Sequence, residues 1–208
     1  MDVAIAGGHG QIALHLARLL TERGDSVRGL IRNPDHAADL EAIGAQPVVC
    51  DMEAEHDLRP FVKGADAVVF AAGAGPGSGP ERKRTVDLGA AVKLMDAGVD
   101  RYVMVGSIGA DDPASGPESM RPYLEAKAEA DETLQQSGLA YTIVRPGSLT
   151  DADATGHVAA GSDVQRGEIP RADVALVLLA VLDTASTVGK TFTVVGGDEP
   201  IDRAIAAL

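Results

Sequence analysis

The sequence predicts an α/β fold, a doubly wound parallel sheet with helices on both faces and a small C-terminal cap. Segments with strand character and segments with helix character alternate along the chain up to residue 144, which is typical of successive βαβ units. The strand segments are almost unbroken apolar runs, such as 67–71 (AVVFA) and 102–105 (YVMV), as expected for strands covered on both faces. Ligands of such sheets bind at the carboxyl ends of the strands.

Glycines mark the ends of the expected helices. Gly24 follows a helix over 11–23, Gly44 follows one over 34–43, and later helices stop before Gly98 and Gly138. The expected helices are 11–23, 34–43, a short one near 57–62, 81–97 and 119–136, and the expected strands are 3–6, 26–31, 46–50, 66–71, 101–105 and 140–144.

The chain after residue 147 has a different character. Residues 148–169 are polar and rich in Gly and Asp, so we expect loops or a small hairpin, with 148–171 serving as cap loops on the substrate side. A helix over 173–183, a strand over 191–195 and a helix after Pro200 follow. Because no long linker or internal repeat interrupts the chain, residues 1–208 are expected to form one domain.

The composition argues against several classes of partner. The chain has 31 acidic and 18 basic residues, a net charge of −13, whereas a nucleic-acid surface needs clustered Lys and Arg. No apolar run approaches the ~20 residues that span a membrane, and the N-terminus enters a strand without room for a targeting peptide. Cys50 is the single cysteine, and no Cys/His cluster has metal-ligand spacing. We expect a cytoplasmic monomer or homodimer that binds small molecules, without metal, nucleic-acid or membrane partners.

The first strand runs into a glycine turn followed by an amphipathic helix. Gly7 can take a positive φ, and Gly10 has no Cβ, so the backbone can approach a phosphate closely. A small residue at Ala13 lets the helix pack on the strand, and the helix start offers free N–H groups to an anion. An ordinary βα turn is the alternative. The residues predicted here to bind a dinucleotide are Gly7, Gly8, His9, Gly10, Gln11 and Ile12.

Residues after the second, third and fourth strands would complete the cofactor site. Arg32 follows the second strand, where binders of NADP place an arginine for the 2′-phosphate and binders of NAD a carboxylate. Asp25 precedes that strand and is expected at the opposite edge of the sheet. Arg32 therefore favours NADP, with NAD as the other possibility. Asp51 and Met52 are expected beside the adenine, and Ala71, Ala72 and Gly73 beside the cofactor.

A second group of residues carries chemistry. Tyr123 and Lys127 are spaced to share one face of the expected helix over 119–136. A nearby ammonium group stabilises phenolate, which makes Tyr123 a usable general acid toward a carbonyl oxygen during hydride delivery. Ser107, at the end of the fifth strand, is expected to hold the same oxygen. The alternative is that Tyr123 and Lys127 form an exposed polar pair with no catalytic role.

These residues together resemble an atypical short-chain dehydrogenase/reductase of the NAD(P)-binding, NmrA-like group, over nearly the whole chain. The resemblance implies a Rossmann fold, a nicotinamide cofactor at the strand ends, Ser, Tyr and Lys as catalytic residues, and 145–147 (RPG) beside the nicotinamide. It therefore adds Lys127, Pro146 and Gly147 to the cofactor contacts. The matching segments are 7–13 (GGHGQIA), Arg32, Asp51, 71–73 (AAG), Ser107, Tyr123 with Lys127, 141–147 (YTIVRPG), 169–175 (IPRADVA) and 195–200 (VGGDEP).

Three positions qualify the resemblance. Asp87 stands where extended members commonly carry an Asn that supports the proton relay. The segment 73–80 (GAGPGSGP) replaces a more ordered loop, and we expect it to be mobile. Asp173 is expected to be a helix N-cap and not a catalytic residue.

The leading functional hypothesis is an NADPH-dependent reductase of a small carbonyl or quinone-like compound. A non-catalytic NADP sensor would bind NADPH without turnover and would present an apolar patch to a partner. A nucleotide-sugar epimerase would need more chain after Arg145 to hold its substrate. A flavin reductase resembling the biliverdin reductase B type would need aromatic side chains for stacking, and only 3% of the residues are aromatic.

Overall fold

The computed structural model describes residues 1–75 and 77–208. Its strands are β1 (Asp2–Ala6), β2 (Ser26–Ile31), β3 (Gln46–Val49), β4 (Ala67–Phe70), β5 (Arg101–Val105), β6 (Ala140–Pro146), β7 (Ser148–Thr150), β8 (His157–Gly161), β9 (Glu168–Pro170), β10 (Lys190–Gly196) and β11 (Glu199–Pro200). Its α-helices are α1 (Gln11–Arg23), α2 (Ala37–Glu41), α3 (Arg59–Val62), α4 (Pro80–Arg82), α5 (Ala91–Met95), α6 (Arg121–Gln136), α7 (Arg171–Asp183) and α8 (Ile201–Ala206).

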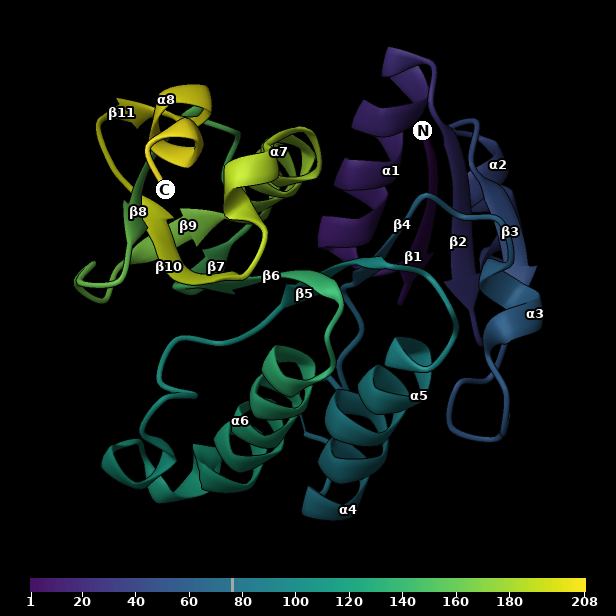
Figure 1. Cartoon of the computed structure of the whole chain (residues 1–208), viewed down its shortest axis with the longest axis horizontal. Helices are drawn as coiled ribbons and strands as arrows, with labels where there is room; N and C mark the ends of the chain where they lie inside the picture. Colours follow the sequence, from purple (N-terminus) through teal and green to yellow (C-terminus); the bar gives the residue numbers. More distant parts are fainter. Residues whose placement is uncertain (76) are drawn as a thin grey trace.

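A nine-stranded sheet in the order β11-β8-β10-β6-β5-β4-β1-β2-β3 forms the middle layer of the molecule (Figure 1). The strands from β3 to β10 in this order pair in parallel, and β8 pairs antiparallel with β10 and with β11. The chain order reverses between β1 and β4, which is the switch point where doubly wound sheets bind ligands. The predicted fold class is confirmed.

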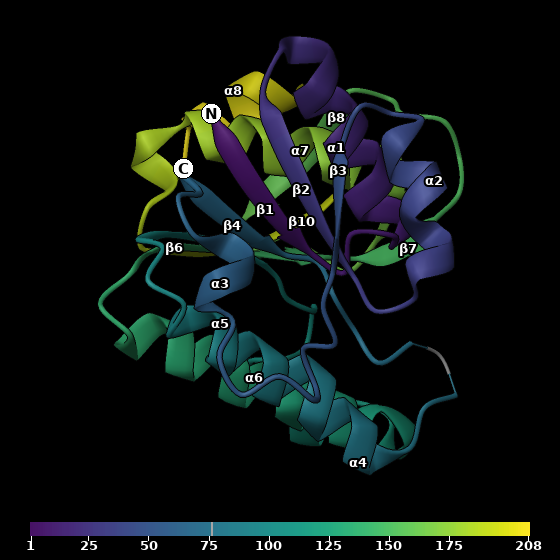
Figure 2. The ribbon, with the colours of Figure 1, turned by 90° about the vertical axis from the view of Figure 1, so that its right-hand side faces the viewer.

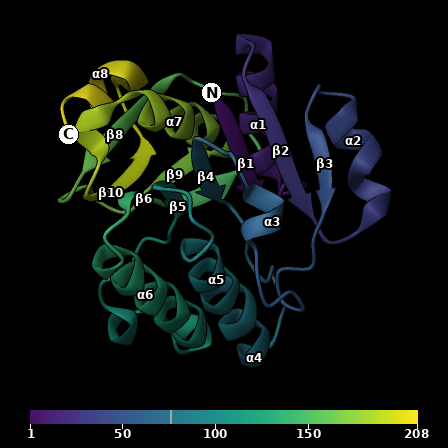
Figure 3. The same cartoon turned by 45° about the vertical axis from the view of Figure 1, so that its right-hand side comes forward.

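Helices cover both faces of this sheet. Figures 2 and 3 show α1, α7 and α8 on one face and α5 and α6 on the other, with the strands between them. Alternate residues of β1 point into different cores: Val3 and Ile5 pack with α1 and α7, whereas Ala4 and Ala6 pack with α5 and α6. Burial on both sides explains why these strands are continuous apolar runs.

Most expected elements agree with the structure in kind and place. The bounds of α1, β2 and β5 coincide with the expected ones. Gly24 ends α1 with a left-handed φ of 94°, the conformation that a glycine C-cap supplies. The expected helix over 81–97 consists of α4, a π-helical stretch over Lys83–Ala90, and α5. The segment 73–80, expected to be mobile, includes Pro76, which lies outside the described residues.

The region expected to be cap loops, 148–171, differs from the prediction. It contains a small parallel sheet of β7 and β9, and β8, which extends the main sheet beyond β10. The strands are short, their partners are distant in sequence, and the segments around them are rich in Gly and Asp, so local patterns do not reveal them.

The prediction that Asp173 caps a helix is wrong. Helix α7 begins at Arg171, so Asp173 lies within its first turn and is fully buried. Its carboxylate accepts hydrogen bonds from the backbone N–H groups of Thr155 and Gly156 and from the Thr155 hydroxyl, at 2.8–3.0 Å. Asp173 therefore anchors the connection that leads into β8.

Candidate functional site

The three glycines of the turn between β1 and α1 bring closely packed backbone to the switch point. Gly7 has a φ of 76°, and a Cβ at this residue would lie 2.7 Å from the Cα of Ala72. A Cβ at Gly10 would lie 3.1 Å from the carbonyl oxygen of Gly7. Gly10 is the N-cap of helix α1, which has no side-chain cap and no acidic residue in its first turn. Its first N–H groups and the positive end of its dipole therefore remain available to an anion.

Gly8, which the sequence predicts to contact the cofactor, packs against strand β2 in the structure. Its backbone N–H donates to the Leu30 carbonyl at 2.9 Å, so that this group is already used. A Cβ at Gly8 would lie 2.6 Å from the Cα of Gly29 on β2. A Cβ at Gly29 would in turn collide with the Leu40 side chain. The sequence signal for this contact was a glycine in the middle of an apolar strand.

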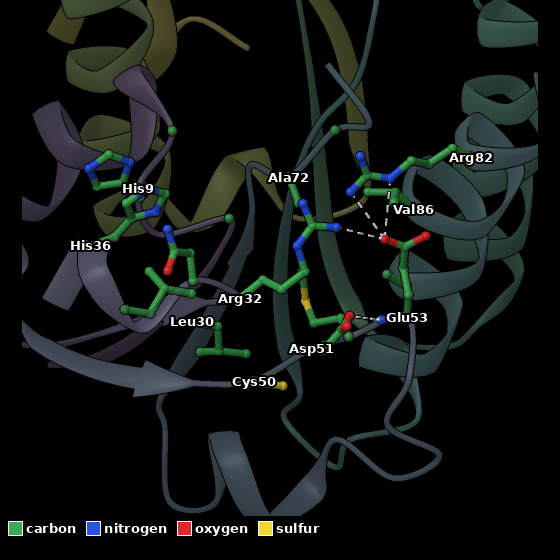
Figure 4. A pocket seen from close by; sticks show the side chains of 17 residues that line it. His9, Leu30, Arg32, His36, Cys50, Asp51, Glu53, Ala72, Arg82 and Val86 are labelled. Carbon is green, nitrogen blue, oxygen red and sulfur yellow. Dashed lines mark hydrogen bonds and ion pairs between the residues drawn. The ribbon is translucent and has the colours of Figure 1, made fainter. Parts of the chain in front are cut away.

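A cavity of about 310 Å³ opens at the carboxyl ends of β1, β2, β3 and β4 (Figure 4). Among the residues predicted to bind the cofactor, those that line it are Gly7, His9, Gly10, Arg32, Asp51, Met52, Ala72 and Gly73. Those that do not line it are Gly8, Gln11, Ile12, Ala71, Lys127, Pro146 and Gly147. Lining residues that sequence reasoning missed include Leu30, His36, Cys50, Glu53, Arg82 and Val86.

The lining fits the adenosine and pyrophosphate of a dinucleotide. Leu30, Ala72 and Val86 present apolar groups to the cavity, as a flat base requires. The glycine turn offers backbone N–H groups at the start of α1 for the pyrophosphate, and Gly7 and Gly10, which line the cavity, have no side chain in the way. One carboxylate oxygen of Asp51 accepts a hydrogen bond from the Glu53 backbone N–H at 3.0 Å.

Two histidines stack at the mouth of the glycine turn. The ring centroids of His9 and His36 are 3.7 Å apart with an interplanar angle of 13°. His9 Nε2 lies 2.7 Å from Asp39 Oδ2. Figure 4 shows both rings beside the cavity, on the side away from Arg82. Stacking and the carboxylate hold His9 in a fixed orientation where the cavity begins.

Charged side chains meet at the opposite rim. Arg32, at the end of β2, is 56% exposed and lies 3.2 Å from a carboxylate oxygen of Glu53. Arg82 approaches the same oxygen at 3.3 Å from α4. The Thr85 hydroxyl donates to the other Glu53 oxygen at 2.7 Å. Asp25 lies at the other edge of the sheet, where it pairs with the N-terminal ammonium group at 2.8 Å.

Helix α6 carries Tyr123 and Lys127 on one face. Lys127 Nζ lies 5.9 Å from the centroid of the Tyr123 ring, and Lys83 Nζ lies at the same distance from it. Lys127 is almost fully buried and donates to the carbonyl of Val105 at 3.1 Å. Ser107 follows β5 two residues later, and its hydroxyl lies 3.4 Å from the Ile108 carbonyl oxygen. The spacing-based expectation that Tyr123 and Lys127 adjoin agrees with this geometry.

Asp87 connects Lys127 to the segment that follows β4. It lies in the π-helical stretch, and its Oδ1 is 3.4 Å from Lys127 Nζ. Its Oδ2 accepts a hydrogen bond from the Ala74 N–H at 3.1 Å. Among residues 1–75 and 77–208, Asp87 Oδ1 has no hydrogen-bond donor, and a Cβ at Gly73 would lie 3.2 Å from it. The carboxylate therefore sits directly behind the backbone of Gly73.

Arg145 is directed toward α6. Its Nε donates a hydrogen bond to Asp131 Oδ2 at 2.9 Å, its Nη2 forms an ion pair with the same oxygen at 2.7 Å, and its Nη1 lies 3.8 Å from Asp111. Burial raises the pKa of the Asp131 carboxyl, against the opposing effect of Arg145. Gly147 donates its N–H to the Val194 carbonyl at 2.9 Å, and a Cβ there would collide with the Gly167 carbonyl. The backbone of Gly167 packs so closely on the end of β6 that residue 147 has no room for a side chain.

Comparison with known proteins adds a family to this geometry. A family model described as NAD(P)H-binding matches residues 7–185. A Bacillus subtilis protein named uncharacterized sugar epimerase YhfK is 38% identical over 214 aligned positions, covering 100% of both chains. A solved structure from Bacillus halodurans, titled as an NAD-dependent epimerase/dehydratase, is 38% identical with a TM-score of 0.94 and covers 100% of both chains.

A functionally named relative is a ketoreductase from Stigmatella aurantiaca, whose name gives 4-hydroxy-2-methyl-3-oxo-4-farnesyl-3,4-dihydroquinoline-1-oxide as its compound. It is 32% identical over 174 positions, which cover 74% of this chain and 52% of the relative. Within the described residues, no group of three or more His, Cys, Asp or Glu side chains is placed to hold a metal ion. No helix in the same ranges is long and apolar enough to cross a membrane.

Proposed function

Since this chain belongs to the NAD(P)H-binding family, we propose that it is a reductase that uses NADPH to reduce a small carbonyl or quinone-like compound. The observation that carries the proposal is the placement of Tyr123 beside an ammonium group that is itself fixed. Lys127 is held by the Val105 carbonyl and by Asp87, so its charge stays within 5.9 Å of the Tyr123 ring centroid.

The proposed roles divide the site into two parts. The glycine turn and the start of α1 bind the pyrophosphate, and Arg32 pairs with the 2′-phosphate. NADPH held in this way would supply the hydride that the carbonyl carbon accepts. Tyr123 donates its hydroxyl proton to the carbonyl oxygen as that oxygen gains charge, and Lys127 stabilises the phenolate that remains. Ser107 donates a hydrogen bond to the same oxygen, and the phenolate regains a proton from solvent.

Asp87 has a positioning role in this proposal. Its carboxylate holds Lys127 from one side and the Ala74 N–H from the other, so the catalytic helix and the strand-end backbone keep a fixed separation. An Asn, which is uncharged, would not balance the buried ammonium group in the same way. The departure from the family pattern at this position therefore has a physical reason in this chain.

A second candidate function, epimerisation through a tightly held NAD, is favoured by the names of two similar proteins. The two functions differ in their net cofactor chemistry. A reductase converts NADPH to NADP in proportion to product, whereas an epimerase restores its cofactor in every cycle. The chain after Arg145 is largely used by β7 to β11 and the last helices, which leaves little of it to enclose a sugar nucleotide.

The experiment is NADPH consumption, followed at its absorbance band, against a panel of aldehydes, ketones and quinones, with nucleotide sugars as a separate arm. We expect stoichiometric NADPH oxidation with at least one carbonyl compound. NADPH binding without turnover on any compound would favour a sensor. Conversion of a nucleotide sugar without net cofactor oxidation would establish the epimerase instead.

A further inference from the structure

Two arginines from opposite walls of the cavity meet at one carboxylate oxygen. Arg32 reaches Glu53 Oε2 from β2, and Arg82 reaches the same atom from α4 through both Nε and Nη2, at 3.4 and 3.3 Å. Figure 4 shows the two guanidinium groups side by side, with dashed lines joining both to the same Glu53 oxygen. The Glu53 carboxylate thus occupies a site for an anion, formed by the Arg32 and Arg82 guanidinium groups that face the cavity.

Among the described residues, only the side chains of Arg32, Arg82 and Thr85 hold the Glu53 carboxylate, whereas its backbone is fixed by other contacts. The Glu53 N–H donates to Asp51, and the Glu53 carbonyl accepts from Lys93 Nζ at 3.1 Å. The Glu53 side chain is 27% exposed, so rotation about its own bonds moves the carboxylate toward solvent without disturbing the main chain. Arg82 is 41% exposed and remains accessible from the cavity when Glu53 leaves.

We propose that Glu53 sets the cofactor preference of the site: its carboxylate holds Arg32 and Arg82 until the 2′-phosphate of NADPH displaces it, and Arg82 then becomes a second ligand of the phosphate. This proposal rests on the proposed function for the binding of NADPH. A phosphate dianion satisfies two guanidinium groups better than one carboxylate does. The ribose hydroxyl of NADH carries no charge and cannot displace Glu53 by this route.

Glu53 therefore competes with the phosphate in this arrangement. Removing its charge should free the two arginines for NADPH, while removing Arg82 should take away a phosphate ligand. Arg84 provides a matched control, because it lies two residues further on and pairs with Glu129 at 2.9 Å, and it does not line the cavity.

The test is calorimetric titration of the full-length protein with NADPH, NADH, adenosine 2′,5′-bisphosphate and adenosine 5′-monophosphate. For Arg82→Gln we expect NADPH and the bisphosphate to bind about tenfold or more weakly, with NADH and the monophosphate unchanged. For Glu53→Gln we expect both 2′-phosphorylated ligands to bind about threefold to tenfold more tightly. Arg84→Gln should change none of the four affinities.

The outcomes separate this proposal from the one on which it rests. Equal effects of Arg82→Gln and Arg84→Gln, with NADPH still bound, would overturn the inference alone. Loss of NADH affinity in Glu53→Gln would also overturn it and would make Glu53 a ligand of the ribose hydroxyls. Failure of the wild-type protein to bind either dinucleotide would instead reject the proposed function. Circular dichroism of each variant shows whether it is folded before titration.

Discussion

Lys127 Nζ lies 3.4 Å from Asp87 Oδ1, and the two side chains are only 3% and 1% exposed. One residue comes from the helix after β5 and the other from the π-helical stretch after β4. The pair thus joins α6, which carries the proposed catalytic tyrosine, to the π-helical stretch that packs beside it. A buried charge without its partner is costly, whereas neutralising both partners together costs much less.

Lys127→Met should lower the free energy of unfolding by about 3–5 kcal/mol, because it leaves the Asp87 carboxylate buried without a cation. Lys127→Met combined with Asp87→Asn should recover a large part of that loss, since the amide oxygen can still accept from Ala74. Lys83→Met is the control: Lys83 is equally far from the Tyr123 ring but forms no ion pair with any described residue. Urea denaturation checks all three. Equal losses for Lys127→Met and Lys83→Met would contradict the role of the pair.

Gly8→Ala should destabilise the fold by about 1–3 kcal/mol, because the added Cβ presses on the backbone of Gly29 and must force β1–α1 and β2 apart. Gly79→Ala is a suitable control, since a Cβ at that residue has nothing within 4 Å. Thermal unfolding followed by circular dichroism measures both. A stability loss of the same size at the two glycines would contradict the steric contact assigned to Gly8.

Arg32→Glu should weaken NADPH binding by about 10- to 100-fold and NADH binding far less, because a charged hydrogen bond to the 2′-phosphate is worth ~1.5–3 kcal/mol. Arg59→Glu serves as the control for the same change of charge, since Arg59 pairs only with Asp57 among the described residues and lies outside the cavity. Equilibrium titration with both dinucleotides is the measurement. Equal losses for NADPH and NADH would rule out a phosphate contact at Arg32.

Cys50 should be a slow nucleophile that the cofactor protects. Burial, followed by the nearby Glu55 and Asp51 carboxylates, raises the pKa of its thiol from 9.0 to about 11. The folded protein therefore holds the thiol proton more strongly than the unfolded chain does. This difference contributes to the free energy of unfolding in full below pH 9.0, the unfolded pKa, and the contribution is lost as the pH rises through about 11. We expect iodoacetamide alkylation to accelerate about tenfold per pH unit from 7 to 10 without a plateau. A plateau below pH 9, or no slowing by NADPH, would contradict this placement of Cys50 in the cavity.

Local signals were sufficient for the alternating part of the fold. The apolar strands are buried on both faces, and Gly24, Gly44 and Gly138 all take left-handed φ values that end helices. The glycine turn, Arg32 and the Tyr123–Lys127 spacing are also local, and they led to the proposed chemistry. In each case the residues that matter lie within one turn or one helix face.

The features that the sequence did not predict depend on contacts between residues far apart along the chain. Strand β8 pairs with β10, from which β9 and α7 separate it along the chain. A region expected to form loops or a small hairpin is therefore part of the main sheet. Arg82 and Glu53 are 29 residues apart, and only the fold brings them together with Arg32 at the rim of the cavity. The burial of Asp173 follows from its contacts with Thr155 and Gly156, which precede it along the chain by a loop and two strands.

The central claim is that Tyr123 donates the proton during NADPH-dependent carbonyl reduction. Its most direct test is the steady-state rate of Tyr123→Phe on a substrate found in the panel, beside NADPH affinity from titration. We expect kcat to fall about 10²- to 10⁴-fold with the Kd for NADPH unchanged. Tyr141→Phe, whose hydroxyl donates to the Gly189 carbonyl, should keep the wild-type rate. A Tyr123→Phe enzyme with wild-type kcat would contradict the account.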